Sequence, residues 1–233
     1  MPRVKKYKHL FFDLDGTLWD WQANSHATLL FLFDKYNLIE HNINFEAFEA
    51  SYMHNNDVMW KLFREAKISK EVLRYHRFYL TLLHFNVDSI ALASSFSEDY
   101  IKESPRGTLL IPSTIETLDH LSAHYQIHLL SNGFKNIQDI KLTGSGLKRY
   151  FKHVVTSESC GYLKPDKRIF HYALSSINAR KEESLMIGDD KEADIMGAQK
   201  FGIDQVFCNY SAEKHQLSPS YEIFKLKELV DIL

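Results

Sequence analysis

Four short polar motifs carry residue types that could transfer a phosphoryl group. The first is Asp13-Leu14-Asp15, followed by Gly16-Thr17-Leu18. Two carboxylates separated by one residue can face the same cavity where the chain turns, so that one attacks phosphorus while the other moves a proton. Asp-x-Asp alone is common in solvated turns, whereas the whole run Asp-x-Asp-Gly-Thr-Leu is specific enough to stand alone as a motif.

The other three motifs supply groups that would bind a phosphate or a cation. Ser131-Asn132-Gly133 offers a hydroxyl and backbone N–H groups for a phosphate oxygen. Lys164, before Pro165-Asp166, can neutralise both the nucleophile and the phosphoryl group. Gly188-Asp189-Asp190, with Asp194 following, supplies the hard oxygen ligands that suit Mg²⁺. Each motif alone is more often a turn or a helix start, but their joint occurrence argues against coincidence.

The elements that would position these motifs alternate between strands and helices. Apolar runs predict strands over residues 9–14, 126–131, 153–157, 184–187, 205–208 and 221–224, and helical spacing predicts helices over 113–125, 166–177 and 193–201. Such alternation predicts an α/β fold, a Rossmann-like parallel sheet with helices on both faces. Ligands of such sheets gather at the carboxyl ends of the strands, which is where the motifs lie.

Residues 19–104 have a different pattern, without glycine, proline or a convincing strand. Leucine and phenylalanine are dense over residues 26–38, and a loose helical period runs over 45–67. Ser69 is expected to begin a third helix and Asp88 to cap a fourth. The sequence therefore predicts an all-helical domain at 19–104, inserted into a catalytic core made of residues 1–18 and 105–233.

Composition excludes several classes of protein. Twenty-eight basic residues against 30 acidic ones give a net charge of −2, so nucleic acid and anionic membranes are not expected as partners. Two cysteines without a CxxC pair indicate neither a zinc site nor a disulfide framework, which suits the cytoplasm. The basic N-terminus is followed by Asp13 and Asp15, which argues against a signal peptide, and no apolar run is long enough to span a membrane. Without a heptad pattern or a long apolar patch, a monomer is expected.

The four motifs, in this order, resemble those of the haloacid dehalogenase-like (HAD) hydrolase superfamily, over residues 8–18 and 105–210. The resemblance implies a HAD-like core with the helical insert as a C1-type cap. It also implies a Mg²⁺-dependent phosphatase acting on a small phosphorylated metabolite. Asp13 would be the nucleophile, forming a phosphoaspartate, and a metal ligand. Asp15 would be the general acid and base, with its backbone carbonyl on the metal, and Asp189 would complete the metal site.

The remaining motif residues receive binding roles from the same resemblance. Ser131 and Lys164 would hold the phosphoryl group and act in catalysis, and Asn132-Gly133 would donate backbone N–H groups to the phosphate. Asp194 would support the metal site, and Asp190 would be a weaker supporting residue because the family varies there.

A narrower resemblance concerns the substrate. The run Leu129–Phe134, with Gly146-Leu147 and Tyr150-Phe151, is similar to pyrimidine 5′-nucleotidases that act on noncanonical nucleoside monophosphates. A phosphomutase acting on a sugar phosphate would share the four motifs and is the alternative. Dehalogenase chemistry is disfavoured because that branch needs no acid at the position of Asp15. A non-catalytic binding module is expected to have lost a motif residue, and none is missing.

Six residues in the helical insert are candidates for contact with a substrate base: Trp19, Trp21, His26, Tyr52, Asn55 and Trp60. Packing within a helical bundle is the simpler role for any one of them. Trp19 and Trp21 are the better candidates because they follow the first motif directly.

Overall fold

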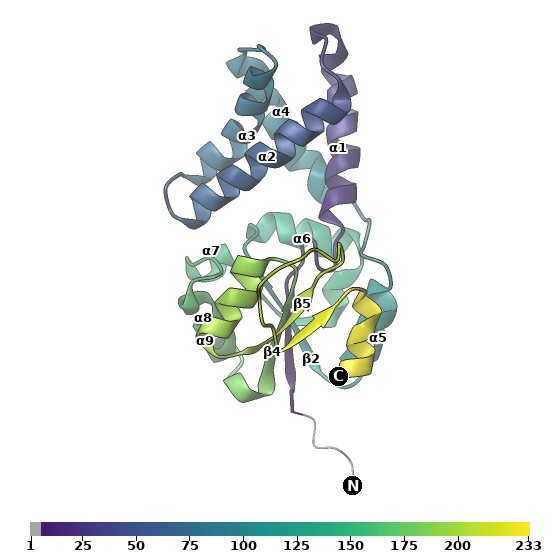
Figure 1. Ribbon diagram of the computed structural model, residues 1–233, viewed down its shortest axis with the longest axis vertical. Coiled ribbons are helices and arrows are strands. Elements are labelled where there is room, and N and C mark those ends of the chain that lie inside the picture. Colours follow the sequence, from purple (N-terminus) through teal and green to yellow (C-terminus); the bar gives the residue numbers. More distant parts are fainter. Residues whose placement is uncertain (1–5) are drawn as a thin grey trace. The chain divides into compact units, whose positions relative to one another are not determined.

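The protein is described here by a computed structural model over residues 6–233; residues 1–5, part of the basic N-terminus, lie outside the described part. The chain forms two compact units (Figure 1). One, here the sheet unit, is made of the described residues up to Trp21 and of Thr108–Leu233, and the other, the helical unit, is Gln22–Gly107. None of the described helices is long and apolar enough to cross a membrane.

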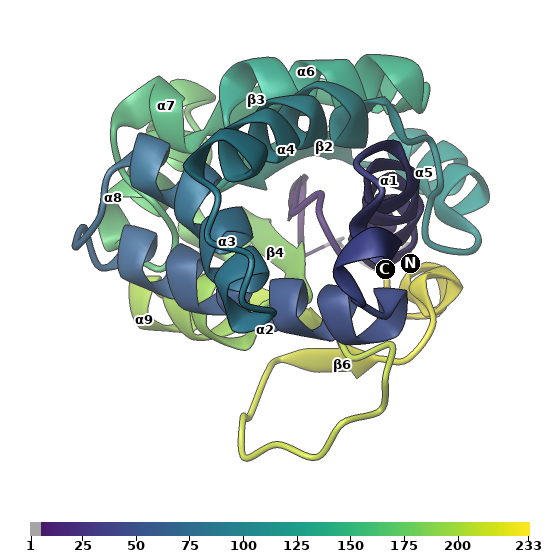
Figure 2. The same ribbon diagram turned by 90° about the horizontal axis from the view of Figure 1, so that it is seen from above.

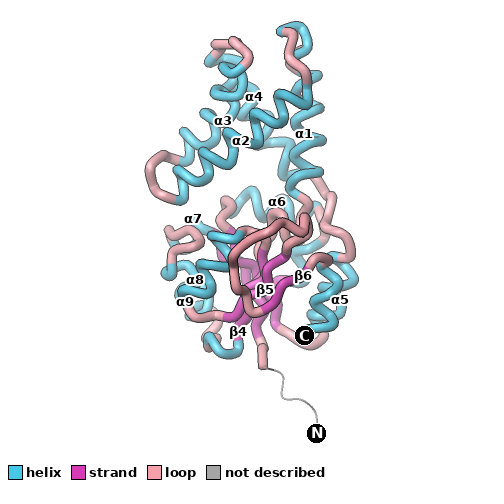
Figure 3. The backbone as a smooth tube through the Cα atoms, in the orientation of Figure 1, coloured by secondary structure: helices cyan, strands magenta, loops and turns pink. Residues whose placement is uncertain are grey.

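Six strands form a single parallel sheet in the order β3-β2-β1-β4-β5-β6. All six predicted strands are confirmed, with small shifts at their ends (Figure 3, magenta). Because β1 lies between β2 and β4, the first motif emerges at the centre of the sheet, where open α/β sheets bind ligands. The strands are β1 His9–Phe12, β2 Gln126–Ser131, β3 Phe151–Thr156, β4 Ser184–Gly188, β5 Asp204–Cys208 and β6 Tyr221–Ile223.

The helices of the sheet unit are α5 Thr114–Ser122, α6 Lys135–Gly144, α7 Ser157–Cys160, α8 Lys167–Ser176, α9 Gly197–Phe201 and α10 Leu229–Ile232. A π-helix, Lys191–Met196, leads directly into α9. Short 3₁₀ helices occupy Leu38–His41, Ser104–Arg106, Leu147–Tyr150, Lys181–Glu183 and Leu226–Glu228. The three predicted core helices are confirmed as α5, α8 and the π-helix with α9. Helix α6, between β2 and β3, was missed.

Helices cover both faces of the sheet, as Figure 2 shows for α5 on one side and α8 and α9 on the other. Side chains alternate along β1: Leu10 and Phe12 join an apolar cluster with residues of α5, α6 and α10, whereas Phe11 joins a cluster with residues of α8 and α9. Both faces of the sheet are therefore buried, which explains why the strand sequences are continuous apolar runs.

The helical unit contains α1 Trp21–Lys35, apart from its first residue, and α2 Phe45–Arg64, α3 Lys70–His84 and α4 Ile90–Glu103. Three of these helices begin at a side-chain cap, since Asn44, Ser69 and Ser89 each accept a hydrogen bond from a backbone N–H of the first turn. Ser69 starts its helix as predicted. The predicted cap of the fourth helix, Asp88, is wrong by one residue, since Ser89 is the cap. The Asp88 carboxylate instead accepts a hydrogen bond from the Tyr79 hydroxyl at 2.9 Å.

The candidate substrate contacts of the helical unit all have partners within it. Tyr52 is wholly buried in the apolar core with Phe48, Phe78 and Phe96, which confirms the packing role that the sequence favoured for it. Of the others, His26 Nδ1 lies 2.9 Å from Glu49 Oε1, Asn55 donates to Thr81 Oγ1 at 3.1 Å, and Trp60 packs edge-on against Phe63.

Trp19 belongs to the sheet unit, which accounts for the position of the unit boundary. The sequence suggested boundaries after residues 18 and 104, and the units divide slightly later, after Trp21 and Gly107. Trp19 forms a bridge with Leu110 and is completely buried in the sheet core, and Trp21 packs partly buried against the same core. A wholly buried Trp19 side chain has no surface for a base, so this prediction is wrong.

Candidate active site

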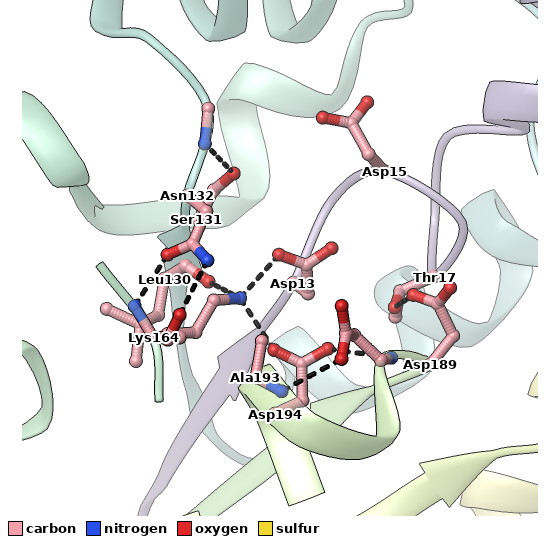
Figure 4. Close-up of polar contacts among 12 residues, drawn as sticks. Asp13, Asp15, Thr17, Leu130, Ser131, Asn132, Lys164, Asp189, Ala193 and Asp194 are labelled. Carbon is pink, nitrogen blue, oxygen red and sulfur yellow. Dashed lines mark hydrogen bonds and ion pairs between the residues drawn. The ribbon is translucent and has the colours of Figure 1, made fainter. Parts of the chain in front are cut away.

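The four motifs meet at the carboxyl ends of the central strands (Figure 4). Asp13 directly follows β1, Ser131 is the last residue of β2, and Asp189 directly follows β4. Phe12 pairs with Leu129 on one side and with Ile187 on the other, so the three strand ends are in register. The parallel register therefore brings together residues that are far apart in the sequence.

Lys164 joins two of these strand ends. Its buried ammonium donates to Asp13 Oδ1 at 2.6 Å and to the Leu130 carbonyl at 2.6 Å. The same nitrogen lies 2.7 Å from Asp194 Oδ1, an ion-pair contact without the geometry of a directed hydrogen bond. Two hydrogen bonds and one ion pair therefore hold the Lys164 ammonium, which fixes the Asp13 carboxylate at the end of β1.

Three carboxylates cluster beside this single ammonium. Ligand oxygens of Asp13, Asp189 and Asp194 lie within 4.8 Å of one another. A Cβ atom on Gly188 would lie 2.2 Å from Asp194 Oδ2, and one on Gly16 would lie 2.3 Å from Asp189 Oδ2, so glycine is required for the carboxylates to approach this closely. Gly16 also has a φ of 87°, which favours glycine.

Burial makes the charges of this cluster costly. It raises the pKa of the Asp13 carboxyl well above its ordinary value, although Lys164 opposes the rise. Burial, with the nearby charge of Asp194, raises the pKa of Asp189 to about 7, against the opposing hydrogen bond from Thr17. Burial alone would lower the pKa of Lys164, but Asp13 and Asp194 outweigh it and the pKa is raised. Lys164 therefore stays charged, and three carboxylates share one cation.

This donor set fits Mg²⁺. With one ammonium against three carboxylates, full ionisation leaves a charge that a divalent cation would balance, and carboxylate oxygens are the ligands that Mg²⁺ prefers. Asp13, Asp189 and Asp194 would hold the ion. Asp194 was expected only in a supporting role, and the structure places it inside the cluster. Asp190 instead caps the π-helix, accepting from the N–H groups of Glu192 and Ala193.

We expect Mg²⁺ to bind about tenfold more weakly at pH 6 than at pH 8. In the metal-free fold the pKa of Asp189 is about 7, so below that pH the carboxyl holds a proton that the cation must displace. The raised pKa also means that the metal-free fold gains stability as the pH falls through 7, whereas bound Mg²⁺ stabilises it most above 7. Calorimetric titration at the two pH values measures the affinity, and thermal unfolding measures the stability.

The exposed carboxylate Asp139 provides the control for this titration, since Asp139→Asn should leave the affinity unchanged, whereas Asp189→Asn should weaken it at pH 8. Equal affinity of the wild-type protein at both pH values would contradict a protonated Asp189 at pH 6, and an unchanged affinity of Asp189→Asn would show that Mg²⁺ does not bind at the cluster.

Ser131 is arranged as a hydrogen-bond donor to an incoming group. Its buried Oγ accepts from the backbone N–H of Gly133 at 3.0 Å and from Gln138 Nε2 at 2.7 Å. With both acceptor positions of the hydroxyl filled, its own hydrogen is left to donate. Phosphate oxygens accept such bonds, so this geometry suits the predicted phosphate-binding role, which stays a prediction.

Asn132 contacts Lys164 through its side chain. Its Oδ1 accepts from the Lys164 backbone N–H at 2.7 Å, and its Nδ2 donates to the Lys164 carbonyl at 2.9 Å. This two-point contact ties the loop that carries Lys164 to the end of β2. The sequence suggested only that backbone N–H groups of Asn132 and Gly133 bind phosphate, and it did not anticipate this contact.

The Asp15 carboxylate points away from the Asp13 cluster (Figure 4). Its Oδ1 accepts from Lys141 Nζ at 2.5 Å, and its Oδ2 accepts from Gln138 Nε2 at 2.9 Å. Both partners lie on α6, the helix that the sequence prediction missed. The available signal was a lysine and a glutamine three residues apart on the same face as the buried Leu142, where a surface helix would carry apolar residues.

Comparison with known proteins places the chain among relatives that share this architecture. The family model described as haloacid dehalogenase-like hydrolase matches residues 7–202. YfnB of Bacillus subtilis, named as a HAD-hydrolase, is 31% identical over 99% of this chain and 97% of its own length. A crystal structure of YfnB bound to magnesium, which reveals interdomain movement in that protein, superposes with a TM-score of 0.90 at 30% identity, covering 98% of this chain and 99% of that one.

Two further relatives carry the names of specific enzymes. Pyrimidine 5′-nucleotidase PynA of Streptococcus pneumoniae is 33% identical over 97% of this chain and 95% of its own length. A glyceraldehyde 3-phosphate phosphatase of Methanothermobacter thermautotrophicus is 31% identical over 87% of this chain and 85% of its own. The match to the family model and the full-length similarity to YfnB and PynA agree with the α/β fold and its four motifs: the chain belongs to the haloacid dehalogenase-like hydrolases.

Proposed function

We propose that this hydrolase is a phosphomonoesterase that works through a phosphoaspartate on Asp13. The observation that carries the proposal is the placement of Asp13 at the end of the central strand, fixed by Lys164 at 2.6 Å and adjoining Asp189 and Asp194. A fixed carboxylate beside a cation site and a hydroxyl donor, Ser131, is equipped to attack an anionic phosphoryl group.

The proposed reaction has two steps. In the first, an Asp13 oxygen attacks phosphorus, the bond from phosphorus to the leaving oxygen breaks, and the Asp15 carboxyl gives its proton to that oxygen. In the second, the Asp15 carboxylate takes a proton from water, whose oxygen attacks the aspartyl phosphate and releases inorganic phosphate and Asp13. When bound, Mg²⁺ would supply positive charge that offsets the repulsion between the nucleophile and the phosphate.

As substrates we propose nucleoside 5′-monophosphates, with small sugar phosphates as the second class. The first is supported by the relative named pyrimidine 5′-nucleotidase, and the second by the relative named glyceraldehyde 3-phosphate phosphatase. The helical unit, Gln22–Gly107, would act as the cap that selects between them. We further expect a monomer working in the cytoplasm, in keeping with the two free cysteines.

Phosphate release in the presence of Mg²⁺ tests the activity and the substrate class together. From a panel of nucleoside 5′-monophosphates, sugar phosphates and p-nitrophenyl phosphate, we expect a pyrimidine nucleoside 5′-monophosphate to give the highest kcat/KM. A preference for sugar phosphates would transfer the assignment to the second class. Release from none of these compounds would refute the proposed phosphatase activity.

A further inference from the structure

Two residues of α6, Gln138 and Lys141, contact the side chain of Asp15 without belonging to any of the four motifs. Both are nearly fully buried on a helix whose remaining polar residues face solvent. Burying a lysine is costly unless its charge is paired, so this placement calls for a specific partner. The partner is the Asp15 carboxylate, at 2.5 Å.

Lys141 is held in place from two directions. Its ammonium lies 4.2 Å from the centroid of the Trp19 ring, in cation–π contact, and this ring is itself wholly buried. The ion pair with Asp15 completes the environment of the charge. Because the ring and the helix are both fixed in the core of the sheet unit, the position of the ammonium, and with it Asp15 Oδ1, is fixed as well.

Gln138 links Asp15 to the hydroxyl of Ser131. Its Nε2 donates one hydrogen to Asp15 Oδ2 at 2.9 Å and the other to Ser131 Oγ at 2.7 Å. The orientation of the Gln138 side-chain amide follows from these contacts, because exchanging its nitrogen and oxygen would place the amide oxygen beside the carboxylate oxygen, where neither can donate a hydrogen bond. Asp15 Oδ2 and Ser131 Oγ are therefore no farther apart than the sum of these distances. This places the Asp15 carboxylate next to the hydroxyl that is free to donate to a phosphoryl oxygen.

Glycine at position 133 permits this link. A Cβ atom there would lie 2.0 Å from Gln138 Nε2, so any larger residue would displace the amide from both of its acceptors. The Gly133 N–H meanwhile donates to the same Ser131 Oγ. The glycine of the second motif therefore makes room for the glutamine that connects the second motif to the first.

We propose that Gln138 and Lys141 are positioning residues that fix the Asp15 carboxyl group beside the phosphate-binding hydroxyl, where it can protonate the leaving oxygen. The inference rests on the proposed phosphatase activity and assigns two new residues to it. Displacement of a catalytic group by about 1 Å can cost about 100-fold in rate, so loss of either contact should impair proton delivery specifically.

The test compares two leaving groups. An alkyl phosphate needs a proton on its leaving oxygen, whereas p-nitrophenyl phosphate releases a stabilised phenolate that does not. For Lys141→Met and for Gln138→Met, we expect kcat/KM to fall by about 10- to 100-fold with the alkyl phosphate that the wild-type enzyme hydrolyses best, and by less than about threefold with p-nitrophenyl phosphate. Both substrates are assayed on one preparation of each variant. The ratio of the two kcat/KM values therefore does not depend on the fraction of the variant that is folded.

Lys148→Met is the matched control, because Lys148 forms an exposed ion pair with Asp139 and should leave both values unchanged. Equal falls with both substrates in the two test variants, or no fall with either, would overturn the positioning role while leaving the phosphatase activity intact. Failure of the wild-type enzyme to hydrolyse either substrate would refute the proposed function itself and this inference with it.

Discussion

Replacing Asp13 by asparagine is expected to lower phosphate release by on the order of 10⁴-fold or more, as removal of a covalent nucleophile does. The amide has nearly the shape of the carboxylate but does not attack phosphorus. The variant should still fold, because Lys164 keeps its contacts with Asp194 and the Leu130 carbonyl. Initial rates with saturating Mg²⁺ and the best substrate of the panel give the comparison, and Asp139→Asn serves as the exposed control.

The covalent step can be observed directly in the same pair of proteins. Acid quenching of the wild-type enzyme during turnover should leave a fraction of chains heavier by one phosphoryl group, and mass spectrometry of peptides should locate it on Asp13. The Asp13→Asn chain should remain unmodified. A variant that turns over at a rate near the wild type would rule out the phosphoaspartate.

Replacing Lys164 by methionine is expected to lower the free energy of unfolding of the metal-free protein by about 3–5 kcal/mol, the usual cost of removing one partner of a buried ion pair. Lys164 is the cation that lies between Asp13 and Asp194, and all three side chains are buried. Without it, the carboxylates must be buried unpaired or take up protons. Urea unfolding at pH 8 in the presence of a chelator measures the loss.

Saturating Mg²⁺ should restore part of the stability lost in Lys164→Met, since a cation at the cluster would again offset the carboxylates. Activity should remain low, because nothing then fixes the Asp13 carboxylate at the end of β1. In the control Lys148→Met, which breaks only an exposed pair, the change should stay below about 1 kcal/mol. A similarly small change in Lys164→Met would contradict the interpretation of Lys164 as the counter-charge of the site.

The sheet could be predicted from the sequence because its strands are buried on both faces. Runs such as Leu10–Phe12 are apolar throughout and end abruptly in charged motifs, so both the strands and their carboxyl ends stand out. From that, the meeting of Asp13, Ser131 and Asp189 followed from parallel pairing alone. The residue types of the four motifs, in this order, then indicated the hydrolase family to which the chain belongs.

The parts that were missed depend on packing that no short pattern reveals. Trp19 looks like a cleft residue because it follows the first motif, but its bridge with Leu110 turns it into the core. Helix α6 follows a phenylalanine that gives no side-chain cap, and its buried Gln138 and Lys141 interrupt the apolar spacing that marks a helix. The two residues that contact Asp15 are polar, and they occupy helix positions where the apolar spacing that predicts a helix needs hydrophobic residues.

The central place of β1 also determines when the site can form. The strand is synthesised before both of its neighbours, β2 and β4, so its first neighbour is made only after the whole helical unit and its second only near residue 188. The helical unit, whose helices are consecutive in the sequence, needs no such distant partner and can form early. Until β4 is available, the apolar edge of β1 remains open to pairing with other chains. Asp13, the proposed nucleophile, is therefore synthesised well before the strands that place it beside Ser131 and Asp189.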